Sequence, residues 1–292
     1  MIYCTTGLEV FDVKRLTLWL CLLLTSCSSA AVPDDKPDAK PVIQQPDPVA
    51  PAGLPLPDPP DVQAPSPRTT TEKPLRYELN PKTFRIQNPD EPNEKVLLLT
   101  FDDGPAGEAT MELLDILDRH KVKSIWFING HQVAKKKQDG TYAVIPEKAA
   151  LLREIHKRGH LVGNHTWWHE NLRKLPAEKQ REEIVSTSQL IADVLGEKPK
   201  YFRPPFGAGT PVSETICREQ GMVSMNWSVG SLDWEPAVYK KPNGITRQVI
   251  STVHSGGNIL FHDRVWTATE LDAILTQLEK DGYQFVLPTE AK

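Results

Sequence analysis

The sequence predicts an α/β fold in which a parallel sheet is covered by helices. Short apolar runs alternate with segments whose apolar residues recur at helical spacing, in about seven units over some 200 residues. The polar motifs come directly after predicted strands, and in barrels of parallel strands the chemistry gathers at the carboxyl ends of the strands. The same pattern therefore predicts both the fold class and the edge of the sheet that carries the site.

The first element of the predicted domain is a strand that begins with V-L-L-L-T at residues 96–100. Its apolar residues indicate burial on both faces, and the following D-D-G-P marks its end and a turn. The next expected elements are a helix from 108 to 117, a strand from 124 to 128, a solvated turn from 135 to 140, a helix from 148 to 157, a strand from 161 to 163 and a helix from 178 to 195. Gly196 ends the last of these helices.

The same alternation predicts the second half of the domain. Its expected elements are a strand near 201–202, a helix from 213 to 219, a strand from 222 to 229, a helix from 245 to 253, a strand from 258 to 261, a helix from 267 to 280 and a strand from 284 to 287. Cys217, the single cysteine of this part, is expected to pack as a small apolar helix residue rather than to act as a nucleophile.

The first 27 residues are expected to be a targeting segment. Lys14 and Arg15 precede an apolar run over 16–24, which has the length of a signal-peptide core and is too short to span a bilayer. The following L-T-S-C resembles the lipobox of bacterial lipoproteins, in which the cysteine, here Cys27, is lipidated. The alternative is an ordinary signal peptide cut near Ser29.

Residues 28–80 are expected to form a proline-rich tether. Twelve of the chain's 26 prolines lie between 33 and 67, mixed with polar residues, and such a composition cannot build a core. Residues 81–292 are then expected to form the folded domain, and the transitional stretch 77–93 is expected to add an edge or a cap to it. A net charge of −4 argues against nucleic acid as a partner, and the membrane is expected to be contacted only through the lipid anchor.

Two carboxylates and two histidines suggest a metal site. Adjacent strand residues point to opposite sides, so Asp102 and Asp103 are expected to leave the strand end in different directions. His165 and His169 are four apart, a spacing that brings two imidazoles to one face of a helical turn. With Asp103 they would make a site of two nitrogens and one oxygen, as in catalytic zinc sites, whereas alone they are more simply a surface pair.

Three further motifs follow predicted strands. They are R-P-P-F-G at 203–207, S-L-D-W at 231–234 and I-L-F-H-D at 259–263. A rigid Pro-Pro turn can hold a backbone N–H toward a pocket, as a developing oxyanion requires. Taken singly, each motif has a structural alternative: an ion-paired arginine, a core tryptophan and a satisfied strand-end histidine.

In this order, T-F-D-D-G-P, H-T-x-x-H, R-P-P-F-G, D-W and L-F-H resemble the motifs of the polysaccharide deacetylase family, the NodB-homology domain of carbohydrate esterase family 4. The resemblance covers about residues 94–289. It implies an irregular (β/α) barrel of about seven strands and a divalent metal, usually zinc, with cobalt, nickel or manganese as alternatives. The implied reaction removes acetyl groups from N-acetylglucosamine units.

The resemblance also implies a role for each matching residue. By position, Asp102 matches the general base, His262 the general acid, Asp103, His165 and His169 the metal ligands, Arg203 the arginine that steadies the catalytic carboxylate, Asp233 the partner of the acid histidine, Trp234 and Leu260 the wall around the acetyl methyl, and Phe206 a tyrosine that contributes a backbone N–H. Gly230 departs from the pattern, because many relatives place an aspartate there.

The expected function is that of a tethered deacetylase of the bacterial cell envelope, at the periplasmic face of an outer membrane if the envelope has one, or secreted. The expected location beside the wall favours peptidoglycan as substrate over chitooligosaccharides or poly-N-acetylglucosamine. A catalytically silent wall-binding lipoprotein and a hydrolase of another acyl amide or ester are the alternatives. Trp167, Trp168 and Trp266 could stack on sugar rings, although core packing explains each of them equally well.

Overall fold

The computed structural model describes residues 76–289. The predictions for the signal segment, for Cys27 and for the tether up to residue 75 lie outside the described residues. None of the described helices is both long enough and apolar enough to cross a membrane.

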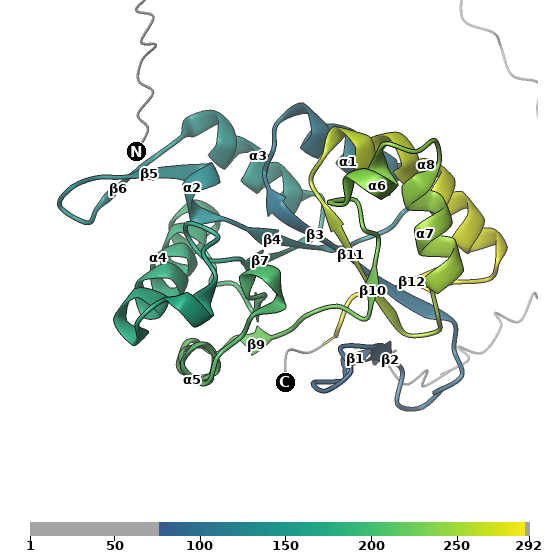
Figure 1. Ribbon diagram of the computed structural model, residues 1–292, viewed down its shortest axis with the longest axis horizontal. Helices are drawn as coiled ribbons and strands as arrows, with labels where there is room; N and C mark the ends of the chain where they lie inside the picture. The colour runs from purple at the N-terminus through teal and green to yellow at the C-terminus, as the bar shows by residue number, and fades with distance from the viewer. Residues whose placement is uncertain (1–75, 290–292) are drawn as a thin grey trace, which may run out of the picture. The chain divides into compact units, whose positions relative to one another are not determined.

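A curled sheet of parallel strands forms the centre of the described part (Figure 1). Its strands, in spatial order, are β10 (Val229–Gly230), β11 (Gly257–His262), β3 (Val96–Gly104), β4 (Ile125–Ile128), β7 (Leu161–Asn164), β8 (Tyr201–Phe202) and β9 (Val223–Ser224), and β12 (Gln284–Phe285) pairs with the start of β3. Among the described strands, β9 and β10 form the two ends of this path, so the sheet is a half-barrel. The predicted α/β class with about seven barrel strands is confirmed.

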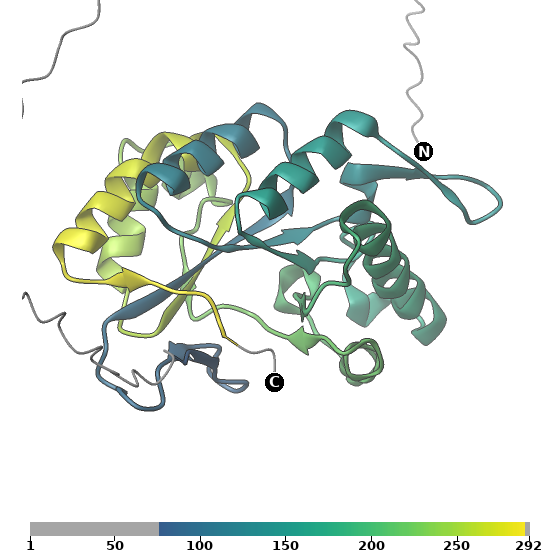
Figure 2. The same cartoon turned by 180° about the vertical axis from the view of Figure 1, so that it is seen from behind.

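Helices cover the outer face of this sheet, and Figure 2 shows α8, α1 and α3 beside one another. The helices are α1 (Glu108–Arg119), α3 (Pro146–Lys157), α4 (Ala177–Leu195), α5 (Pro211–Gln220), α7 (Gly244–Thr252) and α8 (Val265–Lys280), with the short α2 (Gly130–Val133), α6 (Pro236–Tyr239), η1 (Leu172–Lys174) and η2 (Pro205–Gly207). The start of α5 follows from Thr210, whose hydroxyl accepts from the backbone N–H of Ser213, and from Pro211 at the first helical position. Cys217 on this helix is free and buried, as expected.

The central strand β3 separates two apolar clusters. Leu97, Leu99 and Phe101 pack toward the helices, where Phe101 stacks on Trp126 with ring centroids 4.6 Å apart. Leu98 belongs to the second cluster, inside the half-barrel. Asp102 lies four residues after Leu98, so the alternation of strand side chains places it on the inner face as well.

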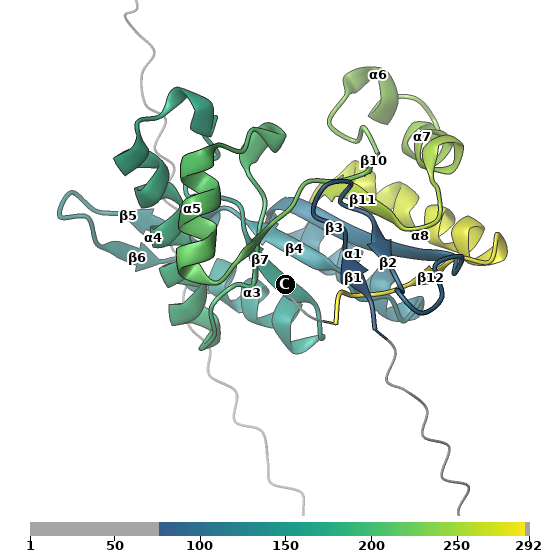
Figure 3. The same cartoon turned by 90° about the horizontal axis from the view of Figure 1, so that it is seen from below.

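The amino ends of the strands are closed by a small antiparallel pair, β1 (Glu78–Leu79) and β2 (Ile86–Gln87), visible beside β3 in Figure 3. The backbone N–H of Ile86 donates to the carbonyl of Gly256, and the Ile86 side chain is completely buried in the inner cluster. Tyr77 packs there too, so the folded part includes residues before the predicted boundary at 81. The cap that the transitional stretch was expected to add is this pair of strands.

One sequence expectation about secondary structure is wrong, and a second is confirmed only in part. The strand predicted from 222 to 229 is two short strands at opposite edges of the sheet, because β9 pairs with β8 and β10 pairs with β11. The turn predicted from 135 to 140 is present at residues 138–140, but it begins later than predicted, because it closes a hairpin of β5 (Ala134–Lys136) and β6 (Tyr142–Val144). Lys136 is not a freely solvated charge there, since its ammonium lies 4.8 Å from the ring centroid of Trp167 and pairs with Glu182.

Candidate active site

A pocket of about 410 Å³ opens at the carboxyl ends of the barrel strands. Its lining consists of Asp102, Asp103, His165, His169, Phe206, Trp227, Trp234, Leu260 and His262. Eight of these nine residues are predicted site residues, and Trp227 is the addition. The two remaining predicted side chains, Arg203 and Asp233, lie behind the lining and hold Asp102 and His262.

Both carboxylates of the D-D pair reach the same place, contrary to the expectation that they diverge. The sheet register shifts between Asp102 and Gly104, and Asp103 has a φ of 68°, which turns its side chain away from strand alternation. His165 Nε2 consequently lies 3.5 Å from an oxygen of Asp102 and 3.7 Å from Oδ1 of Asp103. The local backbone irregularity is therefore what unites the two carboxylates.

The two histidines do not share a helical turn. They lie on an irregular loop after β7, in which Thr166 and His169 have φ values of 67° and 58°. Their imidazoles nevertheless converge, because one ligand atom from each histidine and one from Asp103 all lie within 4.8 Å of one another. The expectation of convergence is confirmed, but its predicted helical cause is wrong.

The three groups fit a divalent metal. The Nδ1–H of His165 donates to the carbonyl of Arg203 at 2.7 Å, which leaves its Nε2 lone pair free to bind an ion. Asp103 Oδ1 is buried and has no hydrogen-bond partner among the described residues, and it lies 3.5 Å from Nε2 of His169. Two imidazole nitrogens and one carboxylate oxygen are a donor set typical of catalytic zinc.

The surroundings of Asp103 and His169 favour the deprotonated forms that a metal requires. Burial raises the pKa of Asp103, but electrostatic interactions with His165, His262, His169 and Arg264 lower it more, so the net pKa of Asp103 is lowered. Burial, and after it the neighbouring His165, lowers the pKa of His169 to about 4.

Asp102 is held by a buried ion pair. Arg203 Nη1 donates to its Oδ1 at 2.8 Å and to the hydroxyl of Thr100 at 2.9 Å. The guanidinium also donates to the carbonyl of Asn226 and lies 4.3 Å from the ring centroid of Phe127. A buried arginine with these partners orients one carboxylate oxygen and leaves the other facing the pocket.

His262 is held by Asp233. Its Nδ1–H donates to Asp233 Oδ1 at 2.7 Å, while Oδ2 accepts from the His262 backbone N–H and from the hydroxyl of Thr267. Burial lowers the pKa of His262, but the hydrogen bond and charge of Asp233 raise it more, and the net pKa is raised. With Nδ1–H committed to Asp233, Nε2 is the nitrogen available to the pocket.

Aromatic and aliphatic side chains complete the wall. The ring centroid of Trp234 lies 5.2 Å from that of His262 and 6.3 Å from that of Trp227, and Leu260 is nearly completely buried beneath. A Cβ on Gly230 would lie 3.3 Å from the indole of Trp234, so the absence of a side chain there gives that ring its room. The ring centroid of Phe206 lies 4.7 Å from that of His169 in an edge-to-face arrangement, and Phe206 is 65% exposed.

The three tryptophans considered for sugar stacking behave differently. Trp167 is completely buried and is a core residue. Trp266 stacks on Tyr239 and donates its indole N–H to the carbonyl of Asp233, so it supports the site from behind. Trp168 is 48% exposed and stacks on His131, and it is the one of the three that faces solvent broadly.

Sequence reasoning missed two site residues. Trp227 lies within the strand predicted from 222 to 229, which the structure divides, and it belongs to none of the polar motifs. Arg264, immediately after I-L-F-H-D, donates to Oδ2 of Asp103 at 2.9 Å. Its position one residue beyond the last polar motif was the available signal.

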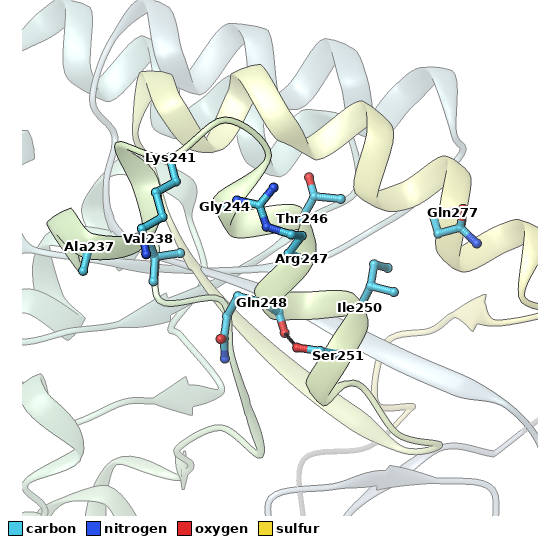
Figure 4. A pocket seen from close by; sticks show the side chains of 10 residues that line it. All are labelled: Ala237, Val238, Lys241, Gly244, Thr246, Arg247, Gln248, Ile250, Ser251 and Gln277. Carbon is cyan, nitrogen blue, oxygen red and sulfur yellow. Dashed lines mark hydrogen bonds between the residues drawn. The ribbon is translucent and has the colours of Figure 1, made fainter.

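A second, more open cavity of about 690 Å³ lies over α6, α7 and α8 (Figure 4). Lys241 and Arg247 are the charged residues of its lining, which contains no carboxylate, histidine or cysteine. This lining therefore offers no metal-binding group, and the chemistry of the described residues concentrates in the pocket at the strand ends.

Comparison with known proteins supports one family. A family profile described as polysaccharide deacetylase matches residues 90–225. Over 205 residues the chain is 34% identical to the peptidoglycan-N-acetylglucosamine deacetylase PgdA of Listeria monocytogenes serotype 1/2a, covering 69% of this chain and 40% of that protein. Over 227 residues it is 31% identical to a peptidoglycan-N-acetylglucosamine deacetylase of Bacillus cereus, covering 74% of this chain and 96% of that protein.

The chain thus spans about two fifths of the length of the Listeria relative. Among solved structures, a CE4 family pseudoenzyme from Bacillus anthracis is similar, with a TM-score of 0.58 and 26% identity over 66% of this chain and 64% of that chain. The ordered motifs, the half-barrel and these matches agree: the chain belongs to the polysaccharide deacetylase family, carbohydrate esterase family 4.

Proposed function

We propose that this protein is a metal-dependent hydrolase that removes the N-acetyl group from N-acetylglucosamine residues of peptidoglycan. The main support for the proposal is that Asp102, His262 and a triad of possible metal ligands all line one pocket of about 410 Å³. An amide is a poor electrophile with a poor leaving group. Its hydrolysis therefore needs a general base, a general acid and a group that polarises the carbonyl.

Asp103, His165 and His169 would hold the metal. A bound zinc ion would supply Lewis acidity, polarising the acetyl oxygen and lowering the pKa of a water to ~7. Asp102 accepts a proton from the attacking water, and the Arg203 ion pair keeps its reactive oxygen aimed at the pocket. Zinc is the metal that the donor set favours, with cobalt, nickel or manganese as alternatives.

The remaining residues act on the developing charge and on the leaving group. The backbone N–H of Phe206 donates to the oxyanion of the tetrahedral intermediate. His262 delivers a proton from Nε2 to the departing glucosamine nitrogen, and Asp233 stabilises the imidazolium that this role requires. Trp234 and Leu260 enclose the acetyl methyl group.

The expected location favours peptidoglycan as the polymer. Lipidation at Cys27 and a proline-rich tether ahead of the folded domain would keep that domain beside the wall, at the bacterial cell envelope. The two curated relatives reported above carry the name peptidoglycan-N-acetylglucosamine deacetylase, which supports the same substrate. Chitooligosaccharides and poly-N-acetylglucosamine are the alternative substrates for the same chemistry.

Mass spectrometry of muropeptides tests the proposal. Purified peptidoglycan is incubated with the zinc-loaded protein and with an Asp103→Ala control, then digested and fragmented. Loss of one acetyl mass from the glucosamine sugar, absent in the control, is the expected result. Loss of the acetyl mass from the muramic sugar would show that the enzyme acts on N-acetylmuramic acid instead. Acetate released only from chitooligosaccharides or poly-N-acetylglucosamine would show that one of these glycans, and not peptidoglycan, is the substrate.

A catalytically silent wall-binding protein is the second candidate, because a structure similar to this one is described as a CE4 family pseudoenzyme. The complete set of base, acid and metal ligands in this chain favours turnover. Zinc binding together with no acetate release from any of the three glycans would favour the silent protein.

A further inference from the structure

Arg264 forms an ion pair that the family resemblance does not include. It is the residue just before α8, and its Nη2 donates to Oδ2 of Asp103 at 2.9 Å. The side chain is 35% exposed, and that of Asp103 is 17% exposed. This cation therefore contacts a candidate metal ligand although it does not itself line the pocket.

The backbone that carries Arg264 is fixed to the strand that carries Asp103. The buried carboxylate of Asp263 accepts from the hydroxyl of Thr110 at 2.6 Å and from the backbone N–H of Ala106 at 2.9 Å. The backbone N–H of Asp263 donates to the carbonyl of Asp102. These bonds connect the end of β11 with β3, with the loop after it and with the start of α1, so Arg264 reaches Asp103 from an anchored position.

The ion pair makes the two oxygens of Asp103 unequal. Oδ2 is engaged by Arg264, whereas Oδ1 is buried without a partner among the described residues and lies within 3.7 Å of Nε2 of both His165 and His169. A carboxylate without such a partner can rotate and bind an ion through either oxygen or both. Arg264 leaves one oxygen, already aimed at the imidazoles, for the ion.

We propose that Arg264 is a positioning residue that holds Asp103 as a single-oxygen ligand of the divalent metal. This inference rests on the proposed function, because it requires the triad to bind a metal. Partners of metal ligands typically change metal affinity about 10–100-fold when removed. A positive charge also repels a metal ion, but this guanidinium is partly exposed and water screens it, so the ordering of Asp103 is expected to dominate.

The test measures zinc affinity by competition with a chromophoric chelator, using the purified full-length protein. Arg264→Met removes the charge and keeps the side-chain length, whereas Arg264→Lys keeps a charge without the planar fork. Arg119→Met is the matched control, because Arg119 makes a comparable 2.7 Å contact with Asp272 on the surface. We expect the zinc Kd to rise about 10–100-fold in Arg264→Met, to rise less in Arg264→Lys and to stay unchanged in Arg119→Met.

The visible absorption spectrum of the cobalt-loaded protein is a second readout, because it depends on coordination number and geometry. It should change in Arg264→Met and not in Arg119→Met. An unchanged or lower zinc Kd in Arg264→Met would overturn the inference, and so would a wild-type protein that binds no zinc. Acetate release by the wild-type protein, measured in parallel, separates the two proposals. If the zinc Kd rises in Arg264→Met but the wild type releases no acetate, the role of Arg264 is supported and the deacetylase function is contradicted.

Discussion

The two ends of the half-barrel are built from opposite kinds of side chain. At the amino ends of the strands, Ile86, Val96 and Leu98 belong to an apolar cluster beside the β1–β2 pair. At the carboxyl ends, Asp102 and Arg203 are equally inaccessible yet charged. The same sheet therefore buries apolar side chains at one end and charged side chains at the other.

The difference separates the part of the protein that stabilises the fold from the part that holds reactive groups at a cost in stability. Apolar burial at the amino end stabilises the fold without any requirement for exact partners. Buried charges at the other end are stable only when each is paired, because an uncompensated buried charge is costly. Changes at the carboxyl end should therefore alter catalysis or break pairs, whereas changes at the amino end should alter stability alone.

The largest effect is expected at the general acid. In His262→Asn the amide can still donate to Asp233, so the fold and the zinc content should persist. Loss of proton donation should lower turnover about 10²–10⁴-fold. Acetate release from the glycan that proves to be the substrate measures this, with circular dichroism and zinc stoichiometry as controls, and near-normal turnover would remove His262 from the mechanism.

The buried ion pair should give the next effect. Arg203→Met leaves Asp102 buried with an uncompensated charge, and the free energy of unfolding at pH 7 should fall by about 3–5 kcal/mol. Urea denaturation followed by circular dichroism measures this. The double variant Asp102→Asn, Arg203→Met removes both charges and should be more stable than Arg203→Met, although inactive. Equal stabilities would mean that the charge on Asp102 is not what destabilises the single variant.

Substitution at the amino end should separate stability from activity. Ile86→Ala creates a cavity in the apolar cluster and should cost about 2–5 kcal/mol of unfolding free energy. Because the pocket lies at the other end of the strands, kcat/KM should stay at the wild-type value. Val144→Ala, at an exposed aliphatic residue, is the matched control with an expected change within about 0.5 kcal/mol. A large fall in kcat/KM for Ile86→Ala would show that the two ends are coupled.

His160 is a polar exception near the amino end, and it should give the smallest and most gradual effect. Burial lowers its pKa to about 4, and its Nδ1 accepts from the backbone N–H of Ser124. Between pH 6.5 and 4 the unfolded chain binds a proton at this residue that the native protein does not, so stability falls as the pH falls. The contribution is at most about 1.4 kcal/mol per pH unit.

Urea denaturation from pH 7.5 to 4.5 measures that dependence. His160→Asn can keep an acceptor for Ser124 but does not titrate, so its stability should fall less steeply over the same range. Identical slopes for the two proteins would assign the acid sensitivity to other groups.

Much of the fold could be predicted because its signals are local. The helices from 108, 148, 178 and 267 all begin within two residues of the predicted starts, since apolar spacing and stop residues lie within each segment. The division of the strand predicted from 222 to 229 could not be predicted. Its apolar residues fit one strand, and only pairing with two distant partners, β8 and β11, separates β9 from β10.

The site was predictable in membership but not in geometry. Eight of the pocket residues belong to the five ordered motifs, and both the residue types and the order of these motifs can be read from the sequence alone. The strand and helix periods gave the wrong local geometry for Asp103 and for the histidine pair, since positive φ values replace regular backbone at both places.

By itself the sequence determined the alternation of the main strands and helices and the set of chemical groups, because these depend on neighbours along the chain. Tertiary structure alone decided that Asp102 and Asp103 share one pocket, that Trp227 lines it and that Arg264 engages Asp103 across 161 residues of sequence. Such contacts depend on how the curled sheet brings strand ends together, and no local period carries that information.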